Sequence, residues 1–97
     1  MFPERIKVGN NTIIGYNTTI LAHEYLIDEY RIGDVIIGDR VLIGANSTIL
    51  PGVTIGNDAI ISAATLVNAD VPEGCFVGGN PMRIIYTKEE MLERNAK

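Results

Sequence analysis

Residues 35–67 read VIIGDR VLIGAN STILPG VTIGND AIISAA TLV, and an aliphatic side chain returns there at every sixth position. Most of these aliphatic residues are followed by Gly or another small or polar residue. The same period begins before this stretch and covers most of the chain. Its positions are Val8, Ile14, Ile20, Ile37, Ile43, Ile49, Ile55, Ile61 and Val67.

A second inward-facing candidate, mostly small or β-branched, stands two residues before each aliphatic. A helix repeats near 3.6 residues and a strand near 2, so neither alone keeps a period of six. A short strand followed by a tight corner does, and this pattern is typical of a parallel β-helix. We therefore predict an all-β solenoid with three hexads per coil, about three coils, and roughly 4.8 Å between coils. Glycine after the aliphatic is expected to supply unusual backbone angles at the corners.

Composition excludes several classes of protein. The chain has 97 residues, enough for one domain, and a net charge of -4, which argues against a nucleic-acid surface. It contains no apolar run of membrane-spanning length and no signal-peptide pattern at Met-Phe-Pro-Glu-Arg, so the expected location is cytoplasmic. Cys75 is the one cysteine, expected to be a reduced packing residue, and with one histidine no metal site is expected.

The period fails once, because Ile20 and Ile37 are seventeen residues apart. About eleven residues, EYLIDEYRIGD at 24–34, are therefore inserted and should form an extruded loop. Loops on rigid solenoids often carry binding residues, although a tolerated insertion or a subunit contact through Tyr25, Leu26 and Tyr30 is the alternative. His23 stands immediately before the loop, with Glu24 beside it. Two roles stay open for His23: a general base, or a surface histidine without a catalytic role.

The C-terminal part departs from the hexad pattern. Residues 68–74 read as a turn-rich exit, and residues 77–85 as an extended return strand after a tight turn. Thr87 and Glu90 have capping-box spacing, which predicts a short helix from about Lys88 to Ala96. We expect a β-helix with its exit strand over residues 1–86, and over 87–97 a helix that covers the last coil.

Several motifs resemble the hexapeptide-repeat acyltransferases, in particular the maltose/galactoside O-acetyltransferase group. They are ANSTILPGVTIG at 45–56, DVP at 70–72 and GGNPMRII at 78–85. The resemblance implies a left-handed parallel β-helix, a homotrimer with active sites between subunits, and acetyl-CoA as donor. It implies an acyltransferase that moves an acetyl group to a hydroxyl, or less readily an amine, of a small acceptor such as a sugar.

The resemblance also implies roles for individual residues. His23 holds the place of the family's catalytic histidine, which would remove the acceptor proton. Ala45 matches the position whose backbone N–H contacts the thioester, and Ala63 matches a main-chain contact to the pantetheine arm. Asn68, Ala69 and Arg83 fall where the family meets the nucleotide end of CoA.

This chain departs from the family pattern in ways that favour a second hypothesis. Ala69 stands where many relatives have lysine, and the family's Gly-Ala-Gly reads Ser62-Ala63-Ala64, whose added side chains would narrow the cofactor groove. Relatives carry at least one more coil before this point, so a shortened protein or part of a longer one is expected, and the acceptor stays open. A non-catalytic β-helix used for assembly or binding is therefore the alternative, whereas a metalloenzyme would need more histidines.

Overall fold

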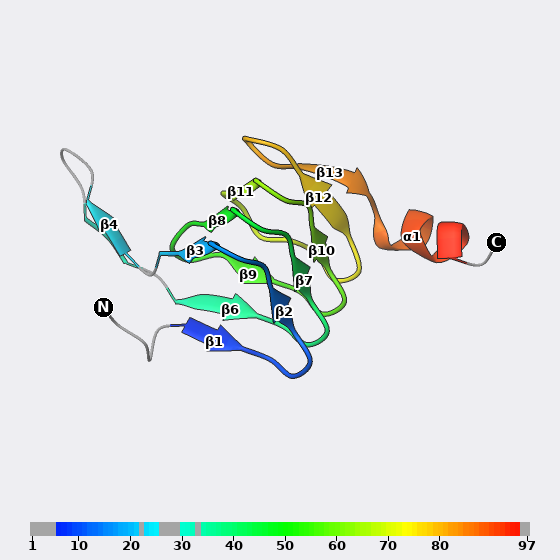
Figure 1. Cartoon of the computed structure of the whole chain (residues 1–97), viewed down its shortest axis with the longest axis horizontal. Coiled ribbons are helices and arrows are strands. Elements are labelled where there is room, and N and C mark those ends of the chain that lie inside the picture. The colour runs from blue at the N-terminus through cyan, green and yellow to red at the C-terminus, as the bar shows by residue number, and fades with distance from the viewer. Residues whose placement is uncertain (1–5, 22, 26–29, 33, 96–97) are drawn as a thin grey trace.

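The computed structural model describes residues 6–21, 23–25, 30–32 and 34–95. Its coils stack into a three-sided solenoid, with one parallel sheet on each side (Figure 1). Sheet A contains β1 (Ile6–Val8), β6 (Val35–Ile37) and β9 (Thr54–Ile55). Sheet B contains β2 (Ile13–Ile14), β7 (Leu42–Ile43), β10 (Ile60–Ile61), β12 (Phe76–Gly78) and β13 (Arg83–Tyr86), of which β13 pairs antiparallel. Sheet C contains β3 (Thr19–Ile20), β8 (Thr48–Ile49) and β11 (Leu66–Val67).

The register of these sheets follows the six-residue period. In sheet C, Ile20 pairs with Ile49 and Ile49 with Val67, so equivalent hexads lie directly above one another. Sheets A and B keep the same alignment. The predicted nine hexads and three coils are therefore confirmed as a parallel β-helix.

The core lies inside the second and third coils. Ile43 is 1% exposed there, and the other inward-facing residues of these two coils, from Val35 to Val67, are buried as well. Of the two buried polar residues in the described chain, Ser47 donates its hydroxyl to the Gly44 carbonyl at 3.0 Å, which satisfies it. In the first coil, Ile14 occupies the same inward position as Ile43 but is 38% exposed.

The coil pattern continues past Val67, which the sequence interpretation missed. Val71 bridges to Ile55, and β12 pairs in parallel with β10 so that Val77 lies beside Ile61. Val77 follows Ile61 by 16 residues instead of 18, because the corner before Val71 is two residues shorter. Residues 68–70 are thus a short corner rather than part of an exit, and Val71 begins the partial coil. Cys75 is buried and free in this partial coil, as predicted.

Glycine at the corners serves close stacking rather than unusual backbone angles, so that part of the prediction is wrong. A Cβ built on Gly44 would lie 2.6 Å from the Ala63 Cα of the next coil. The positive φ falls two residues later, at Asn46 with φ 61°. Residues at this third corner position with positive φ are Asn11, Asn17, Arg40, Asn46, Asp58 and Ala64.

Ala64 has a φ of 57°, and an alanine in this left-handed region costs roughly 1–2 kcal/mol. Glycine removes that cost but gives up about 0.4–1 kcal/mol through the unfolded chain. We expect Ala64→Gly to raise the free energy of unfolding by about 0.5–1 kcal/mol in chemical denaturation. The neighbouring Ala63→Gly, where φ is not positive, should lower it; equal effects of both changes would contradict this account.

The insertion forms an antiparallel hairpin of β4 (His23–Tyr25) and β5 (Tyr30–Ile32), in a sheet of its own. Figure 1 shows β4 projecting away from the coils, so the predicted extrusion is confirmed. The residues at its tip, Leu26 among them, lie outside the described part of the chain.

The C-terminal helix α1 (Lys88–Asn95) begins with the predicted capping box. The Thr87 N–H donates to Glu90 Oε1 at 2.9 Å, and the Glu90 N–H donates to Thr87 Oγ1 at 3.3 Å. The helix packs against β13, while Met82 packs against the core. The division of the chain after residue 86, with a covering helix, stays a prediction. No helix among the described residues is long and apolar enough to span a membrane.

Candidate active site

His23 begins β4, directly after the strand β3 of sheet C. Its backbone lies opposite Ile32 in the hairpin, and Glu24 lies opposite Arg31. The hairpin therefore leaves the solenoid at the corner between sheets C and A. The structure describes the backbone of His23 and not its side chain, so its role as a base stays a prediction.

The corner between sheets B and C carries Ala45 and Ala63 in successive coils. A glycine of the preceding coil stacks closely on each alanine, Gly15 on Ala45 and Gly44 on Ala63. Among the residues that the structure describes, the backbone N–H of neither alanine donates a hydrogen bond. The flanking amides are paired: Gly44 N–H donates to the Ile61 carbonyl at 2.8 Å, and Asn46 N–H donates to the Tyr16 carbonyl at 2.9 Å. Tyr16 holds the same corner position in the first coil, and its N–H is also without an acceptor in the described chain. We call these three N–H groups the amide row.

The corner between sheets A and B shows why the amide row is unpaired. There, the Asn10 N–H donates to Asp39 Oδ1 at 2.7 Å, and the Asp39 N–H donates to Asn57 Oδ1 at 2.7 Å. A side-chain oxygen thus satisfies the equivalent amide of the coil before it. The Asn57 N–H, in the third coil, has no such cap within the described part of the chain. Ala45 and Ala63 have no such oxygen, so the amides stay available to a ligand.

The remaining residues implied by the resemblance lie at the C-terminal end of the solenoid. Asn68 and Ala69 are exposed at the corner that follows β11, and Arg83 is exposed at the start of β13. Gly78 pairs with Arg83, and the carbonyl of the next residue, Gly79, accepts from the Leu66 N–H at 3.0 Å, which ties β12 to β11. Among the described residues, no backbone hydrogen bond joins Asn68, Ala69 or Arg83 to an N–H of the amide row.

Ser62 and Ala64 are the two positions at which the resemblance implies glycine, and both carry a side chain here. The Ser62 hydroxyl lies 3.0 Å from Thr65 Oγ1, and Thr65 is buried. This contact holds the Ser62 side chain within its own corner, the one between β10 and β11. Gly78 of the next coil stacks on Ser62, and a Cβ at Gly78 would lie 2.5 Å from Ser62 Oγ. The glycine at position 78 therefore leaves the space that the Ser62 side chain needs.

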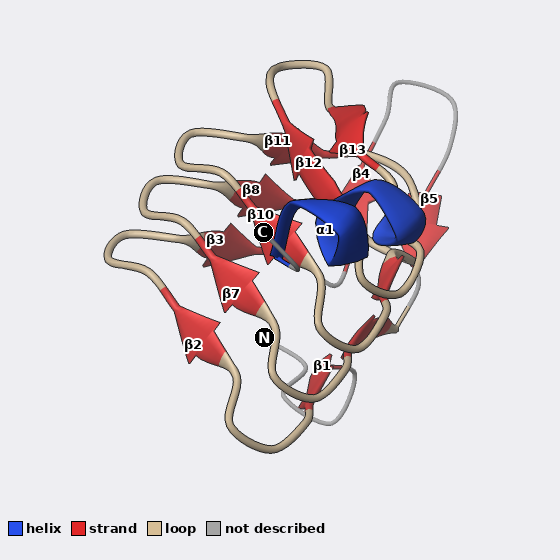
Figure 2. Cartoon of the chain, turned by 90° about the vertical axis from the view of Figure 1, so that its right-hand side faces the viewer, coloured by secondary structure: helices blue, strands red, loops and turns tan. Residues whose placement is uncertain are grey.

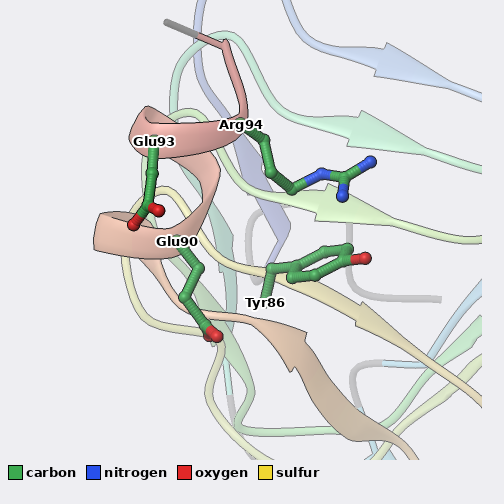
Figure 3. Close-up of a pocket in the computed structure, with 4 residues that line it drawn as sticks. All are labelled: Tyr86, Glu90, Glu93 and Arg94. Carbon is green, nitrogen blue, oxygen red and sulfur yellow. The ribbon is translucent and has the colours of Figure 1, made fainter. Parts of the chain in front are cut away.

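Two pockets lie elsewhere on the described chain, beside α1. One of about 170 Å³ is lined by Tyr86, Glu90, Glu93 and Arg94, with the Arg94 guanidinium 4.5 Å from the Tyr86 ring centre (Figure 3). The other, of about 300 Å³, includes Lys88, whose pKa is raised by its hydrogen bond to Glu73. In the second pocket Lys88 is paired with Glu73, and Asp58 is paired with Arg40. Neither pocket contains a residue of the amide row. We therefore place the candidate site at the amide row, whose N–H groups have no acceptor in the described chain, and not at either pocket.

The amide row and the hairpin occupy different edges of sheet C. The row lies at the corner before β3, β8 and β11, whereas β4 follows β3. Figure 2 shows the stacked loops of the corner between sheets B and C on the left, and β5 of the hairpin on the right. Within the described residues no group of three or more His, Cys, Asp or Glu side chains is arranged to hold a metal ion.

Comparison with known proteins agrees with this architecture. Residues 34–69 match the model of the hexapeptide repeat of succinyl-transferase. The putative acetyltransferase YvoF of Bacillus subtilis (strain 168) is 77% identical over 97 residues, which are 100% of this chain and 56% of YvoF. The hexapeptide-repeat acetyltransferase VCA0836 of Vibrio cholerae, solved with acetyl coenzyme A, has 35% identity and a TM-score of 0.80, covering 84% of this chain and 49% of that one. A galactoside acetyltransferase solved with coenzyme A has 28% identity and a TM-score of 0.85, and the match covers 94% of this chain and 48% of that one.

The fold defines a class, the left-handed parallel β-helices built from hexapeptide repeats. The chain belongs to the hexapeptide-repeat acyltransferase family. It spans about half the length of the relatives that it matches.

Proposed function

We propose that the protein transfers an acetyl group from acetyl-CoA to a hydroxyl of a small acceptor such as a sugar, with His23 as general base. The observation that carries this proposal is the amide row, two of whose members are the N–H groups of Ala45 and Ala63. The relatives named as acetyltransferases, and the neighbours solved with coenzyme A or acetyl-CoA, support the donor.

The spacing of the amide row fits the reactive end of acetyl-CoA. Successive coils are roughly 4.8 Å apart, so the N–H groups of Ala45 and Ala63 are separated by about one coil step. The thioester carbonyl and the nearest amide carbonyl of the CoA arm are separated by a sulfur, two methylenes and an N–H, roughly 6 Å when extended and less when bent. We therefore assign the Ala45 N–H to the thioester oxygen and the Ala63 N–H to the amide oxygen of the arm.

The chemistry requires one base and one oxyanion donor. His23 accepts the proton of the acceptor hydroxyl as its oxygen bonds to the thioester carbonyl carbon. The carbonyl oxygen becomes an anion, which the fixed N–H of Ala45 stabilises without reorganisation. The carbon–sulfur bond then breaks, the thiolate takes the proton back from His23, and the products are an acetyl ester and CoA.

The nucleotide end of CoA would continue toward the last coil. From Ala63 the arm runs on in the direction away from Ala45, toward the C-terminal end of the solenoid. Asn68 and the exposed cation of Arg83 are available there to the phosphates, a surface contact of about 0.2–1 kcal/mol. We propose Asn68 and Arg83 as cofactor-binding residues. Ala69 lacks the cation that the resemblance implies at its position, so that contact with the phosphates is not formed.

The positions of His23 and the amide row favour a site shared between subunits. Because sheet C separates them in one chain, a base on the hairpin of one copy would serve the amide row of another. A cyclic assembly supplies this arrangement at every interface. We propose the homotrimer that the resemblance implies.

Blocking the amide row tests the proposed function directly. In Ala63→Asn, the new Oδ1 should accept from the Ala45 N–H, as Asn57 Oδ1 accepts from Asp39. Losing this donor should lower acetyl transfer by about 10²–10³-fold, measured as CoA release, because the oxyanion loses its partner. The free energy of unfolding should hold or rise by about 1 kcal/mol, since a free amide becomes bonded.

The matched control is Asn57→Ala, which removes a cap at the equivalent position of the other corner. It should lower the free energy of unfolding by about 0.5–1.5 kcal/mol and leave transfer within about threefold. Full activity in Ala63→Asn would contradict the proposed function. If the parent itself bound no acetyl-CoA, the non-catalytic scaffold would replace it.

A further inference from the structure

We infer that Tyr16 forms the acceptor subsite, and that this subsite selects a ring-shaped sugar over an open-chain polyol. This inference rests on the proposed function, because it starts from the thioester at Ala45. Two observations single out Tyr16. Its N–H is the third member of the amide row, and its side chain is 86% exposed. Aromatic residues make up only 6% of the chain, so an exposed tyrosine at this position is distinctive.

The order of the amide row fixes where Tyr16 acts. Ala63, Ala45 and Tyr16 follow one another in successive coils toward the N-terminal end. If the CoA arm occupies Ala63 and the thioester occupies Ala45, the Tyr16 N–H lies one coil step, roughly 4.8 Å, from the Ala45 N–H that holds the reacting carbonyl. It lies on the side away from the arm, which is the side left open to an acceptor.

The backbone around Tyr16 is held by the corner that carries Ala45. The Tyr16 carbonyl accepts from the Asn46 N–H at 2.9 Å, and the Gly15 N–H donates to the Ile43 carbonyl at 2.8 Å. The next side chain is tied as well, because Asn17 Nδ2 donates to Asn46 Oδ1 at 3.0 Å. The Tyr16 N–H is therefore fixed relative to the Ala45 N–H, as positioning of an acceptor requires.

The two groups of Tyr16 match the two kinds of surface on a pyranose. The N–H donates to a hydroxyl oxygen of the acceptor, and the exposed ring gives a flat face for the C–H face of the sugar. Covering about 40–60 Å² of apolar surface at about 25 cal/mol per Å² contributes about 1–1.5 kcal/mol, or up to roughly tenfold in affinity. A flexible polyol offers no flat C–H face and would gain little from the ring.

The experiment compares Tyr16→Ala, Tyr16→Phe and the parent with maltose and with sorbitol, by CoA release at saturating acetyl-CoA. Tyr16→Ala should raise the KM for maltose by about five- to tenfold, whereas Tyr16→Phe keeps the ring and should stay within about twofold. The affinity for acetyl-CoA, measured by calorimetry, should be unchanged in both variants. Asn10→Ala, at the equivalent corner position of the same coil, should leave every value unchanged.

The outcomes separate this inference from the proposed function. An unchanged KM for maltose in Tyr16→Ala, a parallel loss of acetyl-CoA affinity, or a parent that prefers sorbitol would overturn the inference while transfer itself stands. If the parent transfers acetyl to neither compound, the ¹⁵N-tyrosine signals are followed while maltose is added in the presence of CoA. Movement of the Tyr16 signal then supports the subsite, and its absence overturns it.

Discussion

Replacement of His23 by alanine is expected to lower the rate of acetyl transfer by about 10²–10⁴-fold, because the acceptor hydroxyl loses the base that takes its proton. The affinity for acetyl-CoA should stay within about twofold, since the donor is held at the amide row. His23→Asn, which keeps a polar group without a titratable one, should be as inactive as His23→Ala. Turnover within a few-fold of the parent would show that His23 is a surface histidine without a catalytic role.

Mixing two inactive variants extends this test to the shared site. His23→Ala keeps an intact amide row, and Ala63→Asn keeps an intact base. If each site takes the base from one copy and the row from another, co-refolded mixtures should regain activity at about one quarter of the sites. Activity that stays at the sum of the two separate variants would place both groups in one chain and contradict the shared site.

Ile49→Asp is expected to abolish folding of the solenoid. Ile49 is 0% exposed and lies between Ile20 and Val67 in sheet C. An unpaired carboxylate there costs several kcal/mol, comparable with the whole stability of a small domain, about 5–15 kcal/mol. Circular dichroism should show loss of the β spectrum together with loss of the thermal transition.

Thr48→Asp is the matched control, because Thr48 precedes Ile49 in β8 and is half-buried on the outward side of the same strand. A folded spectrum for Thr48→Asp beside an unfolded one for Ile49→Asp supports the inward and outward assignment. Two equally folded variants would show that the six-residue period has been assigned to the wrong face.

Most of the fold could be predicted from the sequence because the six-residue period is unusual. Each coil stacks on an equivalent one, so the period, which resumes after the insertion at 24–34, sets the register of the strands of sheets A, B and C up to Val67. The prediction failed where spacing changed, at the two-residue shortening before Val71, which hid the partial coil that contains Cys75. The corner glycines were misinterpreted because their cause, close approach of the next coil, is not a local property.

The candidate site could be predicted only in part. Ala45 and Ala63 were named through resemblance, and nothing in an alanine side chain indicates a binding role. The useful signal was a contrast between corners: Asp39 and Asn57 cap amides at one corner, whereas alanines at equivalent hexad positions leave them free at the other. That contrast requires the coils to be aligned in space, which also explains why Tyr16 was not recognised as a site residue.

The most direct measurement of the central claim is a titration of ¹⁵N-alanine-labelled protein with acetyl-CoA, followed by NMR. The account predicts that the amide signals of Ala45 and Ala63 move on binding, because their N–H groups acquire carbonyl acceptors. The signal of Ala59, which is 0% exposed inside the solenoid, should stay in place. Binding that leaves both Ala45 and Ala63 unmoved would contradict the assignment of the donor to the amide row.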